Sequence, residues 1–246
     1  MGQIVDAYCT PGTERETPLP PDDLLRMMDE AGIERAVIAP EDREMAVDNA
    51  SGNARMIELA DRSAGRFIPA CTVNPWRGQD ARRIVHDALA GGAKMLVLSP
   101  MLQGFLPTDE LTDPLLELAG ELRLPVYFHT GPHATGAPTQ VVLLASRFPD
   151  TRFILGHCGS TDYADDMPAI LQASPPNVWF ELSLVRPFAM STYDGMVDEA
   201  RLIFGTSAPR NVPAVEVEHF NRHWPIADHP GTYGQNITAL LAEVRS

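Results

Sequence analysis

The stretch 125-PVYFHTGPHATGAPTQVVLLASRFPDTRFILGHCG-159 contains two short apolar segments on either side of an amphipathic one. Val126–His129 and Arg152–His157 are predicted to be strands, and continuous apolar runs such as Phe153–Leu155 are typical of strands that are covered on both faces of a parallel sheet. Thr139–Arg147, between them, has its apolar residues at helical spacing. This alternation of strand, helix and strand indicates an α/β protein.

The same alternation continues in both directions from this stretch. Further strands are predicted at 3–8, 35–39, 66–73, 94–98, 178–182 and 201–205. Further helices are predicted at 22–31, 49–63, 80–90, 109–122, 162–173, 193–199 and 235–244. Eight strands that alternate with eight helices predict a single (β/α)₈ TIM barrel over residues 1–246, with a doubly wound open sheet as the main competitor. Ala208–Gly234 is predicted to be an irregular loop and a candidate lid.

Composition and charge exclude several classes of function. The formal net charge of -14 repels nucleic acid phosphates and anionic lipid surfaces. No apolar run approaches the roughly 18 residues of a membrane span, and no signal peptide is evident at the start of the chain, so a cytoplasmic protein is expected. Cys9, Cys71 and Cys158 are odd in number and widely spaced, which favours reduced thiols.

Several segments in order resemble the amidohydrolase-related family that includes the aminocarboxymuconate-semialdehyde decarboxylases. The segments that carry the resemblance are Ile4-Val5-Asp6, Leu24–Val37, Arg66–Trp76, Gln103-Gly104-Phe105, Pro125–Gly131, Ile154–Gly159, Phe204–Pro209 and Gly234–Leu241. The resemblance implies a barrel whose strand ends hold a metal ion. It also implies that His129 and His157 stand where the fifth and sixth strands of the family supply metal ligands.

The chain departs from the family pattern at the other ligand positions. Tyr8 and Thr10 replace the two histidines of the first strand, and Ser207 replaces the aspartate that ends the eighth strand. Val97 and Ser99 align with the lysine and histidine that family members often carry on the fourth strand. The resemblance therefore implies a depleted metal site.

A catalytic zinc ion usually needs three protein ligands, and only His129 and His157 remain at the expected positions. A third ligand could come from Cys158, from His133, or from His219 and His223. A buried, apolar environment is the expectation for Cys158, a loop position for His133, and an exposed helix face for the last two. The cofactor expectation is accordingly none, or a weakly bound divalent metal such as zinc.

Catalysis without a metal needs a general base and a group that stabilises developing negative charge. The two imidazoles of His129 and His157 could supply both functions, with hydroxyl donors from Tyr8, Thr10, Ser99 or Ser207. Asp6 is expected to support this site by hydrogen bonding and not to react.

Four arginines follow predicted strands and could bind an anionic, small-molecule substrate through its carboxylate. They are Arg43, Arg77, Arg186 and Arg210. A pairing of Arg43 with Glu41 or Glu44 is the plainer alternative for that residue. The Gly- and Pro-containing loop Thr130–Pro138 could place His133 over the same substrate.

The leading interpretation is an amidohydrolase-type hydrolase that acts on a small carboxylate, lactone or amide. Two alternatives stay open: a catalytically inactive binding or scaffolding subunit, and a non-oxidative decarboxylase. The inactive binding or scaffolding subunit would pair with an intact related barrel. A homo-oligomer is the other expected assembly. Bulky residues such as Tyr8, Trp76 and Phe188 closing the mouth would argue against an enzyme, whereas converging imidazoles in a polar pocket would favour one.

Overall fold

The computed structural model describes residues 3–13, 17–131, 134–159, 162–186 and 189–245. Its strands are β1 (Ile4–Cys9), β2 (Ile33–Ile38), β3 (Phe67–Pro69), β4 (Cys71–Thr72), β5 (Leu96–Leu98), β6 (Val126–His129), β7 (Phe153–Gly156), β8 (Val178–Glu181) and β9 (Leu202–Ile203). Its α-helices are α1 (Pro21–Ala31), α2 (Asp42–Ala46), α3 (Asn49–Arg62), α4 (Gln79–Ala90), α5 (Pro100–Gln103), α6 (Asp113–Glu121), α7 (Pro138–Arg147), α8 (Met167–Ala173), α9 (Met190–Tyr193), α10 (Pro213–His223) and α11 (Asn236–Ala242).

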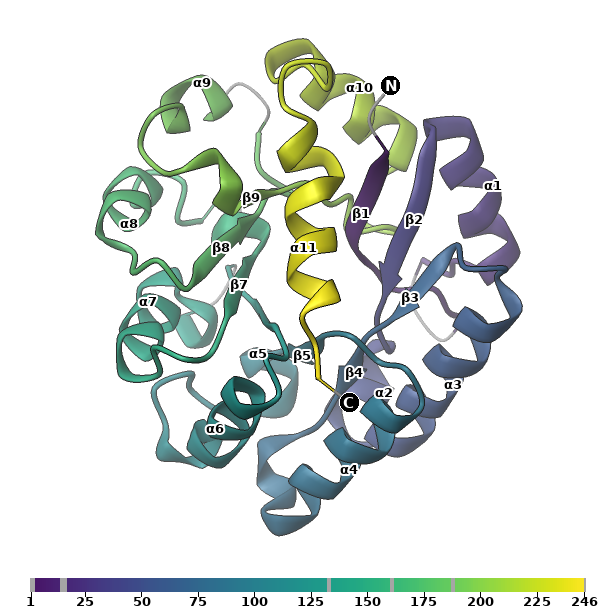
Figure 1. Ribbon diagram of the computed structural model, residues 1–246, viewed down its shortest axis with the longest axis vertical. Helices are drawn as coiled ribbons and strands as arrows, with labels where there is room; N and C mark the ends of the chain where they lie inside the picture. The colour runs from purple at the N-terminus through teal and green to yellow at the C-terminus, as the bar shows by residue number, and fades with distance from the viewer. Residues whose placement is uncertain (1–2, 14–16, 132–133, 160–161, 187–188, 246) are drawn as a thin grey trace.

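All paired strands are parallel and follow one another around a ring (Figure 1). Only Ala70 separates β3 from β4, and the two act as one barrel strand because β3 pairs with β2 and β4 pairs with β5. Among the described residues, no ladder of residue pairs joins β9 to β1. Instead, the backbone amide of Ala7 donates to the carbonyl of Phe204, and that of Ser207 donates to the carbonyl of Tyr8, at 3.1 and 3.0 Å.

These contacts link the two edges of the sheet, so the predicted (β/α)₈ barrel is confirmed. Inward-facing residues of the strands form a core of their own, and a second core lies between the strands and the surrounding helices. The inner core includes Val5, Ala7, Val37, Val97, Tyr127, Ile154 and Ile203. The alternation of apolar side chains between the two cores is what a closed, doubly covered sheet requires.

Helix α11 closes the barrel at the end where the strands begin, and Figure 1 shows it crossing the middle of the ring. Ile237, Leu240 and Leu241 of this helix belong to the inner core. Thr238, on the same helix, accepts a hydrogen bond from Arg35 near the start of β2. Because one end of the barrel is sealed in this way, access to its interior is left to the end where the strands finish.

The sequence-based prediction was wrong in two segments. Ala208–Gly234 was expected to be irregular, but α10 lies within it and packs against α1. Its periodicity is weak because Pro213 and Phe220 are its only fully buried residues, so few apolar positions mark the helix. The helix expected at 193–199 is absent: α9 ends at Tyr193, and Gly195 takes a left-handed φ of 72°.

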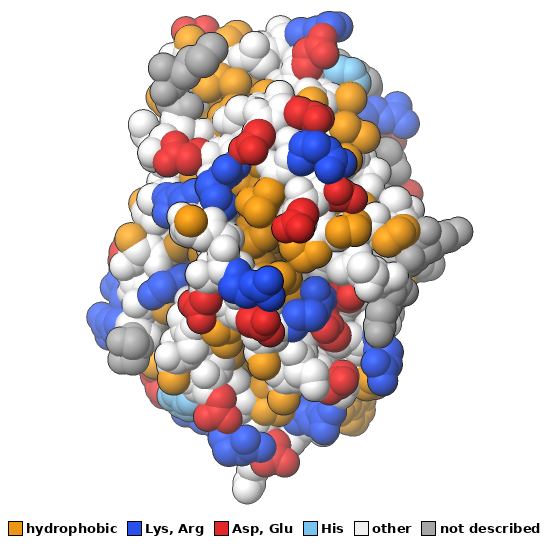
Figure 2. Space-filling model, turned by 90° about the vertical axis from the view of Figure 1, so that its right-hand side faces the viewer, with side chains coloured by type: hydrophobic (Ala, Val, Ile, Leu, Met, Phe, Trp, Pro, Cys, Tyr) orange, Lys and Arg blue, Asp and Glu red, His pale blue; other side chains and the backbone are white. Residues whose placement is uncertain are grey.

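The outer surface carries both signs of charge. On the side that faces the viewer in Figure 2, acidic and basic side chains alternate with small apolar areas. The ion pair Arg66–Asp29 at 2.7 Å joins α1 to the residue before β3, and Arg26–Asp23 at 2.8 Å is an ion pair within α1. Within the described part of the chain, no helix is both long and apolar enough to span a bilayer.

Candidate active site

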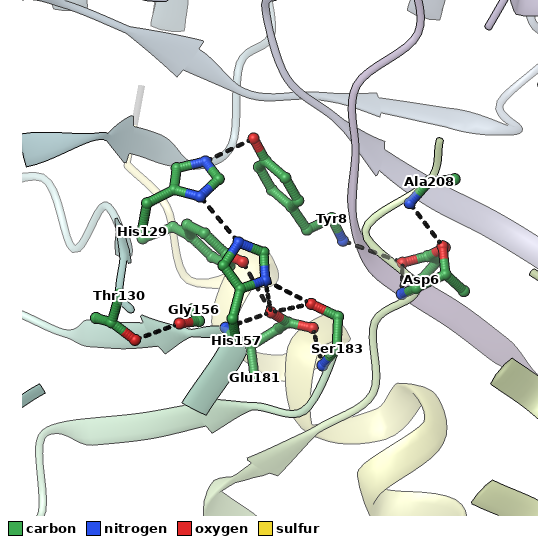
Figure 3. A network of polar contacts seen from close by, with 11 residues as sticks. Asp6, Tyr8, His129, Thr130, Gly156, His157, Glu181, Ser183 and Ala208 are labelled. Atoms are coloured by element: carbon green, nitrogen blue, oxygen red, sulfur yellow. Dashed lines mark hydrogen bonds and ion pairs between the residues drawn. The ribbon is translucent and has the colours of Figure 1, made fainter. Parts of the chain in front are cut away.

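A chain of hydrogen bonds runs across the open end of the barrel (Figure 3). The Tyr8 hydroxyl, near the end of β1, lies 2.7 Å from Nε2 of His129, the last residue of β6. Nδ1 of His129 lies 2.9 Å from Nε2 of His157. The register between β6 and β7 pairs His129 with Gly156, so His157 follows directly beside it. The two imidazoles therefore converge, the arrangement that was expected to favour an enzyme.

The chain of hydrogen bonds continues into the protein interior through Ser183 and Glu181. Nδ1 of His157 lies 2.7 Å from the Ser183 hydroxyl, which donates to Oε2 of Glu181 at 2.9 Å. Glu181 is the last residue of β8, and both side chains are fully buried. Five side chains thus form one continuous path from the pocket to a buried carboxyl group.

Two glycines make room for this path. A Cβ atom on Gly205 would stand 2.1 Å from Oε1 of Glu181, and one on Gly156 would stand 2.3 Å from the ring of Tyr127. Tyr127 in turn donates its hydroxyl hydrogen to Glu181 at 2.7 Å and stacks on Tyr8, with ring centroids 4.7 Å apart. The niche for Glu181 is therefore built by the backbones of neighbouring strands and by an aromatic pair.

The backbone is strained where the path leaves the sheet. His157, Cys158 and Ser207 have positive φ angles of 61°, 44° and 57°. Non-glycine residues seldom adopt this conformation, and such residues cluster at functional sites, where the surrounding structure holds them in place. Two of the three line the candidate pocket.

Burial governs the electrostatics of this path. Burial, together with the positive charge of Arg210, lowers the pKa of His157 from 6.5 to about 3. Oε2 of Glu181 lies 3.6 Å from Nδ1 of His157 and by itself would favour a charged imidazole. The complete loss of hydration outweighs this attraction, so His157 is neutral near pH 7. Burial also raises the pKa of Glu181, against the opposing effect of the hydrogen bonds that it accepts.

A small pocket of about 60 Å³ opens above the two imidazoles. Its lining consists of Tyr8, Asp42, Ser99, Met101, Leu102, His129, Thr130, Gly131, Gly136, His157, Ser207 and Arg210. Six residues that the sequence singled out therefore meet here: the two histidines, three hydroxyl residues and one arginine. Arg210 is exposed, so its guanidinium group is available to an anion at the rim.

Other residues proposed from the sequence lie elsewhere. Thr10 is buried and donates its hydroxyl hydrogen to the carbonyl of Ala208, outside the pocket lining. Trp76 is 66% exposed and also lies outside the lining. His133 and Phe188 fall outside the described residues.

The remaining three arginines do not line this pocket. Arg43 lies exposed on α2, and Arg186 is exposed after β8. Arg77 donates to the carbonyl of Val47 and lines a separate groove between α3 and α4. The two glutamates suggested as partners of Arg43 both contact Arg55, whose guanidinium lies 2.6 Å from Glu44 and 3.3 Å from Glu41.

The described residues do not fit a divalent metal ion. No group of three or more His, Cys, Asp or Glu side chains among them could hold one. Cys158 is buried in the outer core, and His219 and His223 are exposed on α10, as expected. Nε2 of His129 and Nε2 of His157 are already hydrogen-bonded to Tyr8 and to His129.

Three residues of the site were missed by sequence reasoning. Glu181 stands in a segment that was predicted only as a strand, Ser183 follows that segment directly, and Asp42 at the pocket was not considered. A single acid in the apolar run 178-VWFELSL-184 was a signal, because a carboxyl group in a buried strand must find hydrogen-bond donors. Asp6 shows the same behaviour: it accepts hydrogen bonds from Cys9 and Thr206, as expected for a supporting residue.

The fold and the pocket define a (β/α)₈ barrel with a polar site at the carboxyl ends of its strands, the place where barrel enzymes carry their active sites. A family model described as amidohydrolase matches residues 11–243. The chain belongs to the amidohydrolase family. A comparison with curated proteins gave no match.

Solved structures of enzymes share the whole architecture. A 5-carboxyvanillate decarboxylase from Novosphingobium aromaticivorans, in complex with manganese, has a TM-score of 0.79 and 16% identity, covering 98% of this chain and 96% of that chain. A 2,6-dihydroxybenzoate decarboxylase from Rhizobium has a TM-score of 0.78 and 16% identity, covering 98% and 99%. A 4-oxalomesaconate hydratase from Rhodopseudomonas palustris has a TM-score of 0.74 and 16% identity, covering 98% and 96%. At this identity the likeness establishes the fold.

The first prediction concerns metal content. Protein purified without a His tag is expected to contain far less than one equivalent of zinc or manganese per chain, because the imidazole nitrogens are engaged in the path. Elemental analysis by mass spectrometry measures this directly, with His129→Ala and His157→Ala variants prepared in parallel. About one ion per chain in the wild type, lost in both variants, would contradict the prediction.

Proposed function

We propose that this protein is a non-oxidative decarboxylase of a small carboxylic acid that works by acid–base catalysis through Tyr8 and His129. The observation that carries the proposal is the contact of 2.7 Å between the Tyr8 hydroxyl and Nε2 of His129 in a pocket that Arg210 also lines. The named activities of two structural neighbours, both decarboxylases of hydroxybenzoate-type acids, support it.

Decarboxylation suits the residues of this pocket better than hydrolysis does. Hydrolysis needs a strongly activated water molecule and stabilisation of an oxyanion. The aspartate that the family resemblance would place on the last strand is Ser207 here, and a serine hydroxyl is a poor base. Decarboxylation instead needs a held carboxylate, little surrounding water and one proton donor. The small volume of the pocket, Arg210 at its lining and the Tyr8 hydroxyl support a reaction with these needs.

Arg210 and two serines are suited to hold the carboxylate. A guanidinium group binds a carboxylate through two parallel hydrogen bonds, and the hydroxyls of Ser99 and Ser207 line the same space. Both serines are almost fully buried, with exposed fractions of 3% and 2%. The small volume matches the carboxylate-bearing end of a substrate.

Tyr8 and His129 are suited to exchange the proton. The C–C bond to the carboxylate breaks, CO₂ leaves, and the electron pair stays on the substrate carbon, which takes a proton from the Tyr8 oxygen. The proton that the substrate receives comes from water and binds the side of the Tyr8 oxygen that faces the pocket. The hydrogen that Tyr8 shares with His129 Nε2 passes to that nitrogen meanwhile and returns to the Tyr8 oxygen once the substrate carbon is protonated. Each turnover therefore consumes one solvent proton and releases one CO₂.

Turnover in D₂O tests the reaction. Hydroxybenzoates and small unsaturated acids are incubated with the enzyme, and the products are examined by NMR. A product with one deuterium on the carbon that lost CO₂ is the expected result. Hydrolysis of lactones or amides without turnover of any carboxylate would establish a hydrolase instead. Binding of carboxylates without turnover of any compound would favour the binding-subunit alternative.

The second prediction concerns Arg210. Arg210→Ala is expected to raise KM for the carboxylate about tenfold or more, because a charge-assisted hydrogen bond contributes roughly 1.5–3 kcal/mol. The effect on kcat should be smaller. Steady-state kinetics measure both constants, with Arg186→Ala as a matched control at an exposed loop arginine outside the pocket lining. Equal KM values for Arg210→Ala and the wild type would contradict the assigned role.

A further inference from the structure

Glu181 fixes the direction of the hydrogen bond that it shares with Ser183. Its carboxylate accepts from the Tyr127 hydroxyl, from the amides of His157 and Ser183, and from the Ser183 hydroxyl, at 2.7–2.9 Å. A serine hydroxyl has a single hydrogen. Because Ser183 gives that hydrogen to Glu181, its oxygen can only accept from Nδ1 of His157, 2.7 Å away.

The direction of this hydrogen bond fixes the directions of the next hydrogen bonds along the path. A neutral imidazole carries one N–H group, so His157, which donates from Nδ1, must accept at Nε2. The donor at 2.9 Å can only be Nδ1 of His129. A neutral His129 then accepts at Nε2, and the Tyr8 hydroxyl is the donor there at 2.7 Å. Every donor in the path points away from the pocket and toward Glu181.

We infer that Glu181 and Ser183 are positioning residues that hold both histidines as Nδ1–H tautomers and thereby turn the lone pairs of the Tyr8 oxygen toward the pocket. This inference rests on the proposed function for its catalytic meaning, because an oxygen in that orientation is ready to take up the proton that the substrate later receives. It also explains how a carboxyl group remote from the substrate affects the reacting hydroxyl. The orientation itself is a property of the protein alone.

The assignment is unusual and therefore testable. Free neutral histidine in water favours a proton on Nε2, whereas both site histidines are assigned a proton on Nδ1. Long-range ¹⁵N–¹H NMR spectra distinguish the two tautomers and the charged form. Signals of the two rings are assigned by their loss in His129→Gln and His157→Gln variants. Nδ1–H tautomers for both rings at pH 7 are the expected wild-type result.

Variants test the cause of the orientation. Glu181→Gln removes the charge that orders the path, and Ser183→Ala removes the acceptor of the His157 Nδ1–H group. Each is expected to move a substantial share of one or both histidines to the Nε2–H tautomer. Ser183→Thr keeps the hydroxyl and is expected to restore the wild-type tautomers. Two variants at separate positions keep the test informative if one of them does not fold.

Asp6→Asn is the matched control. Asp6 is as buried as Glu181 and also accepts hydrogen bonds from backbone and side-chain donors, but the path from Tyr8 to Glu181 does not include its carboxylate. The tautomers are expected to stay unchanged in this variant. An Nε2–H or charged ring in the wild type, or unchanged tautomers in both Glu181→Gln and Ser183→Ala, would overturn the inference. These spectra need no substrate, so their outcome does not depend on whether the decarboxylase assay succeeds.

Discussion

Tyr8→Phe is expected to lower kcat by about 10²–10⁴-fold, the usual contribution of a positioned general acid or base. The hydroxyl is the only part of the side chain that the substitution removes, and it is the group that meets His129 at 2.7 Å. The phenyl ring can keep the stacking on Tyr127 that holds the side chain in place. KM for the carboxylate should change little, because Arg210 supplies the binding contact in the proposed mechanism.

Steady-state kinetics in H₂O and deuterium incorporation in D₂O measure this effect. Tyr233→Phe is the matched control: Tyr233 is also buried, but its hydroxyl donates to the carbonyl of Trp224 and lies outside the pocket lining. Its activity should equal that of the wild type. A Tyr8→Phe enzyme with a kcat within threefold of the wild-type value would remove Tyr8 from the reaction.

The sequence predicts the barrel well because its signals are local. Each strand of the barrel is a short apolar run between loop residues, and Val126–His129 was predicted with the bounds that the structure gives to β6. His129 and His157 were recognisable because parallel strands place their carboxyl ends on one face of the sheet. The convergence of the two rings follows from the β6–β7 register, which no local pattern specifies.

The path behind His157 could not be predicted in the same way. Glu181 contacts Tyr127 and His157, which are 54 and 24 residues away in the chain. A carboxyl group in an apolar strand signals a buried polar network, but its partners are set by tertiary packing, including the space left by Gly156 and Gly205. The role of α11 as a seal was equally hidden, because an amphipathic helix can pack either outside the barrel or across its end.

The residues that stand at the family's metal-ligand positions in this chain are consistent with one another. A histidine on the first strand would compete for a metal ion, whereas Tyr8 at that position supplies a hydroxyl that reaches His129. The imidazoles then bind each other, and Ser183 and Glu181 complete the path inward. These side chains satisfy one another's hydrogen-bonding groups, as buried polar networks must. In the proposed mechanism, catalysis is acid–base chemistry through this path.

The final prediction is a loss of stability at acid pH that belongs to His157. Burial and Arg210 lower its pKa to about 3 in the folded protein, against 6.5 for an ordinary histidine. The unfolded chain therefore binds the proton more readily. The stabilisation from neutral His157 is fully present above pH 6.5 and is lost as the pH falls toward 3, by about 4–5 kcal/mol in total.

Urea unfolding of the wild type and of His157→Gln at pH 7.5 and pH 5 measures the contribution of His157 to this loss of stability. The free energy of unfolding of the wild type should fall by about 2 kcal/mol more than that of the variant between these two values. Burial raises the pKa values of Asp6 and Glu181, and because both carboxyl groups remain in the variant, the difference between the two proteins reports mainly on His157. His219→Gln, at an exposed site on α10, should follow the wild type. Equal losses in the wild type and His157→Gln would mean that His157 is hydrated, and its ring would then be free to take up a proton at physiological pH.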